Sequence, residues 1–130
     1  MKNKFLSMMI LGATVLTSMT GVYASAVNFV DKEIPVRQHN AVLNPANVST
    51  PGGAANGLVW LSKCEADAVT FKATNNGHDF GGDTTVYGAG KTLAVTYNAT
   101  YAPGTQMQAH FRNHNWSNNN NSMSGVFDYR

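Results

Sequence analysis

The chain has 130 residues and a single cysteine, Cys64, which excludes a disulfide within the chain. Nine Lys and Arg residues face seven Asp and Glu residues, and the excess comes from Lys2 and Lys4, so residues 27–130 carry seven charges of each sign. A domain without net charge has no general attraction to nucleic acid or anionic lipid, which argues against a nucleic-acid binder and a cationic membrane-disrupting peptide.

The first 26 residues have the three parts of a secretory signal peptide. Lys2 and Lys4 give a positive start, an apolar run covers residues 5–16, and Ala24-Ser25-Ala26 is a cleavage signal of small residues. The apolar run is shorter than the roughly 20 residues that span a bilayer, which favours a cleaved leader over a membrane anchor. We predict cleavage after Ala26 and an extracellular protein with no transmembrane segment.

Residues 27–57 are predicted to form an irregular N-terminal lead-in. Its segments VNFV (27–30) and IPVR (34–37) are compatible with short edge strands. The stretch NPANVSTPGGAANG (44–57) is rich in Pro, Gly and Asn, a composition typical of a linker or long loop.

Residues 58–130 have the pattern of a β domain. Apolar and polar side chains alternate, as they do in strands with one buried face, along the segments DAVTFKAT (67–74), KTLAVTYNATY (91–101), QMQAHFR (106–112) and SGVFDYR (124–130). The apolar run GLVWLS (57–62) indicates a further strand with Trp60 in the core. Segment 75–83, dense in Asn, Gly and Asp, is a predicted turn.

Two of these strands are predicted to pair as a hairpin. Residues 92–101 and 105–112 are joined by Ala102-Pro103-Gly104, a sequence that suits a tight turn. Short alternating strands separated by turn signals indicate a small sandwich or barrel. We predict an all-β fold, a small antiparallel β-sandwich that follows the cleaved signal peptide.

The segment HFRNHNW (110–116) contains the strongest candidate site. His110 and His114 are four residues apart, but in a strand Arg112 lies between them on the same face, and a cation disfavours a bound metal ion. We therefore predict no metal and no cofactor. If ligand binding occurs here, the period of two places His110, Arg112, His114 and Trp116 on one shared face, where exposed aromatic and polar side chains bind sugars or a partner surface.

The other polar motifs have simpler explanations. His78, Asp79 and Asp83 lie in a glycine-rich turn and do not match a calcium-loop spacing. Cys64 is either a small buried residue, a free thiol or an intermolecular link. No nucleophile motif or spaced pair of carboxylates is present, and we predict a protein that is not an enzyme.

Three segments carry a resemblance to known proteins: VWLSKCEADAVTFKATNNG (59–77), AHFRN (109–113) and SGVFDYR (124–130). With them, the chain resembles small secreted β-rich proteins of Gram-positive bacteria whose function is unknown. It is more distantly similar to the lactococcin-972-like bacteriocins, although it lacks the basic, Gly- and Trp-rich start expected in that group. These resemblances imply an exported β domain and carry over no catalytic residues.

The sequence thus predicts a secreted, non-enzymatic interaction module that acts extracellularly or at a cell surface. Its expected partner is a cell-wall glycan or a surface protein. The alternative is a bacteriocin-like secreted toxin that acts on competing cells.

Overall fold

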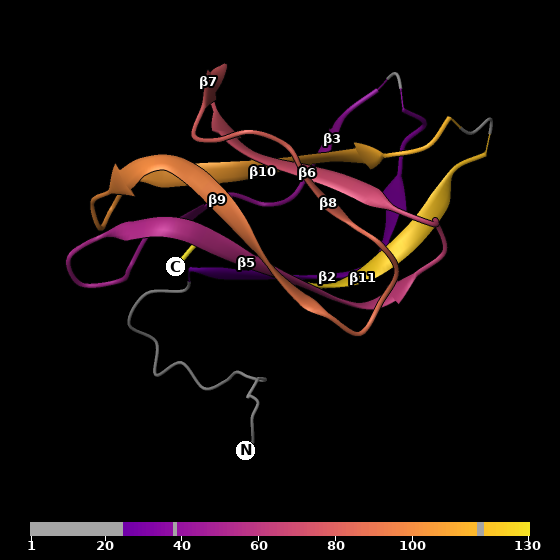
Figure 1. The fold of residues 1–130 in the computed structure, drawn as a ribbon, viewed down its shortest axis with the longest axis horizontal. Coiled ribbons are helices and arrows are strands. Elements are labelled where there is room, and N and C mark those ends of the chain that lie inside the picture. Colours follow the sequence, from indigo (N-terminus) through magenta and orange to yellow (C-terminus); the bar gives the residue numbers. More distant parts are fainter. Residues whose placement is uncertain (1–24, 38, 117–118) are drawn as a thin grey trace.

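A computed structural model describes residues 25–37, 39–116 and 119–130 of the chain. They form an all-β fold of antiparallel strands (Figure 1). The predicted signal peptide lies outside the described residues, except for Ser25 and Ala26. Within the described ranges, no helix has the length and apolar character needed to cross a membrane.

In the described ranges ten strands build two sheets that pack face to face as a sandwich. The four-stranded sheet has the order β2-β11-β5-β9, and the six-stranded sheet the order β3-β10-β6-β7, with β4 on β10 and β8 on β6. Figure 1 shows β10 and β6 above β5, β11 and β2. The strands are β2 (Ala26–Ile34), β3 (Ala41–Val42), β4 (Ala46–Asn47), β5 (Ala54–Cys64), β6 (Val69–Asn75), β7 (His78–Asp79), β8 (Thr84–Val86), β9 (Thr92–Tyr101), β10 (Gln106–Asn113) and β11 (Asn121–Asp128).

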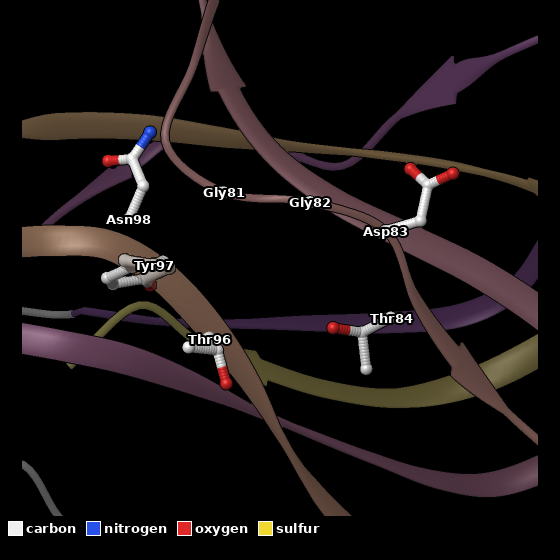
Figure 2. A pocket seen from close by; sticks show the side chains of 7 residues that line it. All are labelled: Gly81, Gly82, Asp83, Thr84, Thr96, Tyr97 and Asn98. Carbon is white, nitrogen blue, oxygen red and sulfur yellow. The ribbon is translucent and has the colours of Figure 1, made fainter.

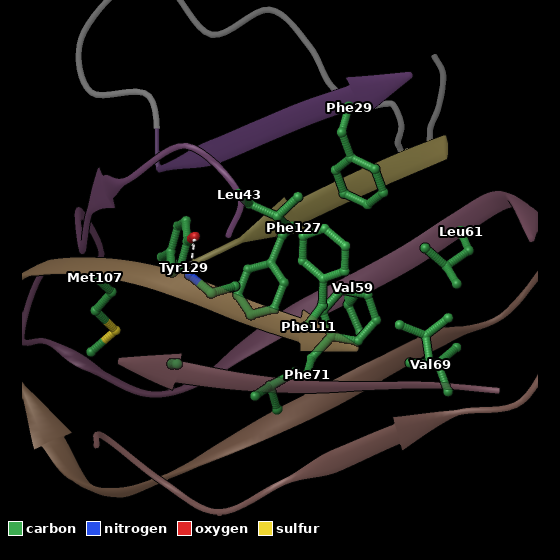
Figure 3. Close-up of a cluster of buried hydrophobic side chains, with 14 of the residues drawn as sticks. Phe29, Leu43, Val59, Leu61, Val69, Phe71, Met107, Phe111, Phe127 and Tyr129 are labelled. Carbon is green, nitrogen blue, oxygen red and sulfur yellow. Dashed lines mark hydrogen bonds between the residues drawn. The ribbon is translucent and has the colours of Figure 1, made fainter. Parts of the chain in front are cut away.

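The core lies between the two sheets and follows the alternation of the sequence (Figure 3). Because successive side chains of a strand point to opposite faces, every second residue enters the interior. Phe71 of β6 lies 6.1 Å from Phe111 of β10 and 5.9 Å from Phe127 of β11, ring centre to ring centre. All three rings are fully buried, so this aromatic cluster joins the two sheets.

The predicted turn at residues 75–83 is present and begins with a tight hairpin. Asn75 pairs with His78, and the two residues between them, Asn76 and Gly77, both have positive φ angles of 48° and 82°. Asn-Gly is the favoured pair for this turn because Gly lacks a Cβ and Asn tolerates the left-handed conformation.

The prediction that residues 27–57 are irregular is wrong in part. β2 runs over nine residues and pairs with β11, and Phe29 and Ile34 enter the core. Its alternation is broken at Asp31, which has a φ of 47°, where the register with β11 shifts. This irregularity makes the strand hard to recognise in the sequence. The buried residues on its two sides, Phe29 and Ile34, are five positions apart, whereas a regular strand would separate them by an even number.

The predicted hairpin of residues 92–101 and 105–112 is also wrong. β9 pairs with β5 in one sheet, whereas β10 pairs with β6 in the other, so the turn at Pro103 carries the chain across the sandwich. After Thr96, β9 departs from β5 before Tyr101 pairs with Ala54: Tyr97 bridges to Gly81, and the Asn98 N–H donates to the Phe80 carbonyl at 2.7 Å. Alternation alone cannot distinguish neighbouring strands from strands that face each other, because both bury one face.

Tyr129, which follows β11, connects the sheets by a buried hydrogen bond (Figure 3). β3 and β4 both pair with β10, but the chain between them interrupts the ladder at Asn44. The Tyr129 hydroxyl occupies this interruption: it accepts from the Ala109 N–H at 2.7 Å and donates to the Asn44 carbonyl at 3.2 Å.

Candidate functional site

The predicted site residues His110 and Arg112 lie on β10 in the six-stranded sheet. Their neighbours Ala109 and Phe111 are fully buried, whereas His110 and Arg112 are partly exposed. They are therefore on the outer face, as the alternation predicts. Cross-strand neighbours of His110 are Lys72 on β6 and Val42 on β3, and that of Arg112 is Thr70.

Arg112 belongs to a chain of alternating charges across the sheet. Its guanidinium lies 3.1 Å from a carboxylate oxygen of Asp83, and the Lys72 ammonium lies 3.8 Å from Asp83 and 3.4 Å from Asp79. These side chains are between a quarter and three fifths exposed, so each ion pair contributes at most about 1 kcal/mol. Their main effect is to hold the charged groups in fixed positions on the face.

His114 follows β10 and continues its outer face. Its Nδ1 lies 3.0 Å from the Thr70 hydroxyl and 3.4 Å from the Thr85 hydroxyl. The Tyr87 ring packs edge-on against the imidazole at 5.9 Å between ring centres. His114 is therefore fixed by β6 and β8 next to an exposed aromatic ring.

Trp116 is placed differently from the three residues before it. Its indole is 68% exposed, and the Arg37 guanidinium lies over the ring at 5.2 Å from its centre. Such a cation–π contact holds the indole toward the segment that follows β2. The structure thus places His110, Arg112 and His114 along one face of β10, whereas Trp116 packs on Arg37. We name the set Lys72, Asp83, His110, Arg112 and His114 the β10 outer face.

A pocket of about 300 Å³ adjoins the β10 outer face (Figure 2). It lies between two segments, Gly81–Thr84 before and within β8 and Thr96–Asn98 in β9. Gly81 allows this close approach, since a Cβ there would lie 2.3 Å from the Thr96 carbonyl oxygen. The lining offers the hydroxyls of Thr84 and Thr96, the Asn98 amide and the Asp83 carboxylate, all able to bond a polar ligand.

Asp83 links the pocket to the β10 outer face, because it lines the pocket and forms an ion pair with Arg112 of the β10 outer face. Figure 2 shows its carboxylate at the end of the pocket away from Asn98. A polar ligand in the pocket would therefore meet a carboxylate whose charge Arg112 and Lys72 balance. Sequence reasoning missed this pocket, because its two walls are far apart in the chain.

Cys64 and the metal-ligating residue types are the remaining candidate groups. Burial raises the pKa of the half-buried Cys64 thiol, which also donates to the Ala66 carbonyl at 3.2 Å, so it is protonated at neutral pH. Within the part of the chain that the structure describes, no three His, Cys, Asp or Glu side chains are grouped to hold a metal ion.

The prediction that Trp60 is a core residue is wrong. Its indole is 41% exposed, because Val59 and Leu61 point into the core and Trp60 points outward between them. Residues 57–62 are nearly all apolar, so residue type alone does not distinguish the two faces of β5. The burial of successive residues nevertheless alternates along the strand.

Searches of protein families, of curated proteins and of solved structures found no match to this chain.

Proposed function

We propose that this protein is a secreted, non-enzymatic interaction module that binds a partner outside the cell or at a cell surface. The observation that supports this function best is the β10 outer face. Its charged side chains, which come from several strands, form ion pairs with one another, and His114 packs against the Tyr87 ring. A surface that is ordered before binding loses little entropy when a partner docks. The rigid sandwich beneath it supplies that order.

The chemistry of the β10 outer face favours a polar partner. Arg112 and Lys72 donate, Asp83 accepts, and His114 lies beside the exposed Tyr87 ring. Balanced charges do not select for a polyanion such as nucleic acid. A cell-wall glycan or a surface protein offers the mixture of donors, acceptors and apolar groups that this surface would bind.

Co-sedimentation with intact Gram-positive cells tests this function. We expect the protein, starting at Val27, to pellet with the cells while cell survival is unchanged. The double variant Arg112→Ala, Trp116→Ala should pellet less. Lys63→Ala is the matched control, since Lys63 is also an ion-paired cation, 2.8 Å from Asp31, but belongs to the other sheet.

Each outcome separates the alternatives. Pelleting with loss of viable cells would support the bacteriocin-like toxin instead. Equal pelleting of the double variant and the wild type would refute the assignment to the β10 outer face and Trp116. Absence of pelleting would refute the cell-surface function.

A further inference from the structure

The outer face of the four-stranded sheet carries a second exposed tryptophan surface. Cross-strand pairing aligns Asn28 of β2, Val126 of β11, Trp60 of β5 and Thr92 of β9 in one row. In the next row Leu58 lies between Ala94 of β9 and Asp128 of β11. We name these seven residues the Trp60 face.

This surface is rigid, because it covers the core of the sandwich. Residues that alternate with it, Val59, Leu61 and Phe127, are fully buried between the sheets. β5 and β11 are the two central strands of their sheet, each paired on both sides. The Trp60 backbone is thus held in place, with its indole on the outer face of the sheet.

Asp128 is the single charged side chain among these seven residues, and none of the seven is a cation. A carboxylate without a neighbouring cation on the face disfavours an anionic ligand and points to a neutral one. The Asp128 carboxylate also accepts from the Arg130 N–H at 2.8 Å, and Lys63 nearby pairs with Asp31 at 2.8 Å. The polar groups in the tryptophan row are the Asn28 amide and the Thr92 hydroxyl, which are exposed and neutral.

The exposed apolar area is too small for a stable contact between two copies of the chain. With 41% of its surface exposed, Trp60 offers about 100 Å², and Leu58 and Val126 are only partly exposed. Stable protein interfaces bury about 800 Å² on each partner. One aromatic platform between hydrogen-bonding groups instead matches the size of one or two sugar rings.

We propose that the Trp60 face binds a neutral polysaccharide. The indole stacks on the apolar face of a pyranose ring, and Asn28 and Thr92 on either side of the row bond sugar hydroxyls. An extended chain bound along the tryptophan row would cross β2, β11, β5 and β9. This proposal rests on the proposed function and specifies a ligand class and a second binding surface for it.

The test measures the affinity of the purified exported protein for two neutral oligosaccharides, cellohexaose and chitohexaose, by titration calorimetry. We expect Trp60→Ala to weaken binding about ten-fold or more, and Trp60→Phe to weaken it less, as expected for the loss of a stacking contact. Val42→Ala is the control, because it removes an apolar side chain that is 40% exposed, about as much as Trp60, from the other sheet, and it should leave the affinity unchanged. Thermal unfolding of each variant shows that the fold is kept.

A second readout locates the ligand directly. In a Trp116→Phe background Trp60 is the one tryptophan left, so its fluorescence should shift on addition of either oligosaccharide and not on addition of an anionic heparin oligosaccharide. Absence of binding to both neutral oligosaccharides would overturn the proposal, as would equal binding by Trp60→Ala. Self-association of the wild type that Trp60→Ala abolishes would assign the face to a second copy, and would overturn it too.

These failures are distinguishable from failure of the proposed function. Cell binding that depends on Arg112 and Trp116 but not on Trp60 would preserve the interaction module and refute only the Trp60 face. Oligosaccharide binding without cell binding would support the Trp60 face and refute the cell-surface function.

Discussion

Replacement of Tyr129 by Phe tests how the two sheets are held together. The Tyr129 hydroxyl is the acceptor at 2.7 Å for the Ala109 N–H, on the side of β10 opposite β6, where the ladder with β3 and β4 is interrupted. Ala109 is fully buried. Tyr129→Phe therefore leaves a buried N–H without an acceptor, which costs about 1–3 kcal/mol.

We take about 2 kcal/mol as the expected loss in the free energy of unfolding, since water can replace the second bond at the exposed Asn44. For a domain of this size, the loss lowers the unfolding midpoint by about 10 °C. Urea unfolding and calorimetry measure both quantities.

Tyr101→Phe is the matched control for this experiment. It removes a hydroxyl that bonds the Asn98 side chain on the exposed surface, so the loss should stay below about 0.5 kcal/mol. If Tyr129→Phe and Tyr101→Phe have equal effects on stability, the argument that the Tyr129 hydroxyl completes the broken ladder is refuted.

Three further predictions concern alkaline stability, a glycine and processing. Burial raises the pKa of Tyr129 to about 12 and also raises the pKa of Tyr97, so both hydroxyls lose their protons at lower pH in the unfolded chain than in the folded one. The contribution of Tyr129 to stability should therefore be constant below about pH 10 and fall by about 3 kcal/mol as the pH reaches 12. A urea midpoint that does not change over this range would contradict this. A Cβ on Gly125 would lie 2.1 Å from a backbone oxygen of β5, so Gly125→Ala should destabilise the fold by about 3 kcal/mol, whereas Gly82→Ala, in open space, should be neutral in the same urea titration. The intact mass of the exported protein should correspond to a chain that begins at Val27, and a mass that includes the first 26 residues would disprove the predicted cleavage.

The fold class could be predicted from the sequence because alternation reports directly on burial. Met107, Ala109 and Phe111 alternate with polar residues, and all three are fully buried. Alternation carries no information on which strand is the neighbour, and for that reason β9 and β10 were expected in one hairpin. A single residue with positive φ, Asp31, was enough to hide β2.

The candidate site was predictable to the extent that it lies on one strand. The spacing of His110 and Arg112 gave their common face, whereas the partners Asp83, Lys72 and Thr70 come from β6 and the segment before β8. No local pattern indicates such contacts, because sheet pairing creates them. For Trp60, residue type suggested burial, while its position between two inward-pointing neighbours determined exposure.

Binding to intact cells tests the central claim most directly. The measurement is the fraction of the protein that pellets with Gram-positive cells as its concentration rises, with viable cells counted in the same tubes. We expect saturable binding, full survival and weaker binding by the Arg112→Ala, Trp116→Ala variant. Binding that does not saturate, or that is absent, would contradict this expectation.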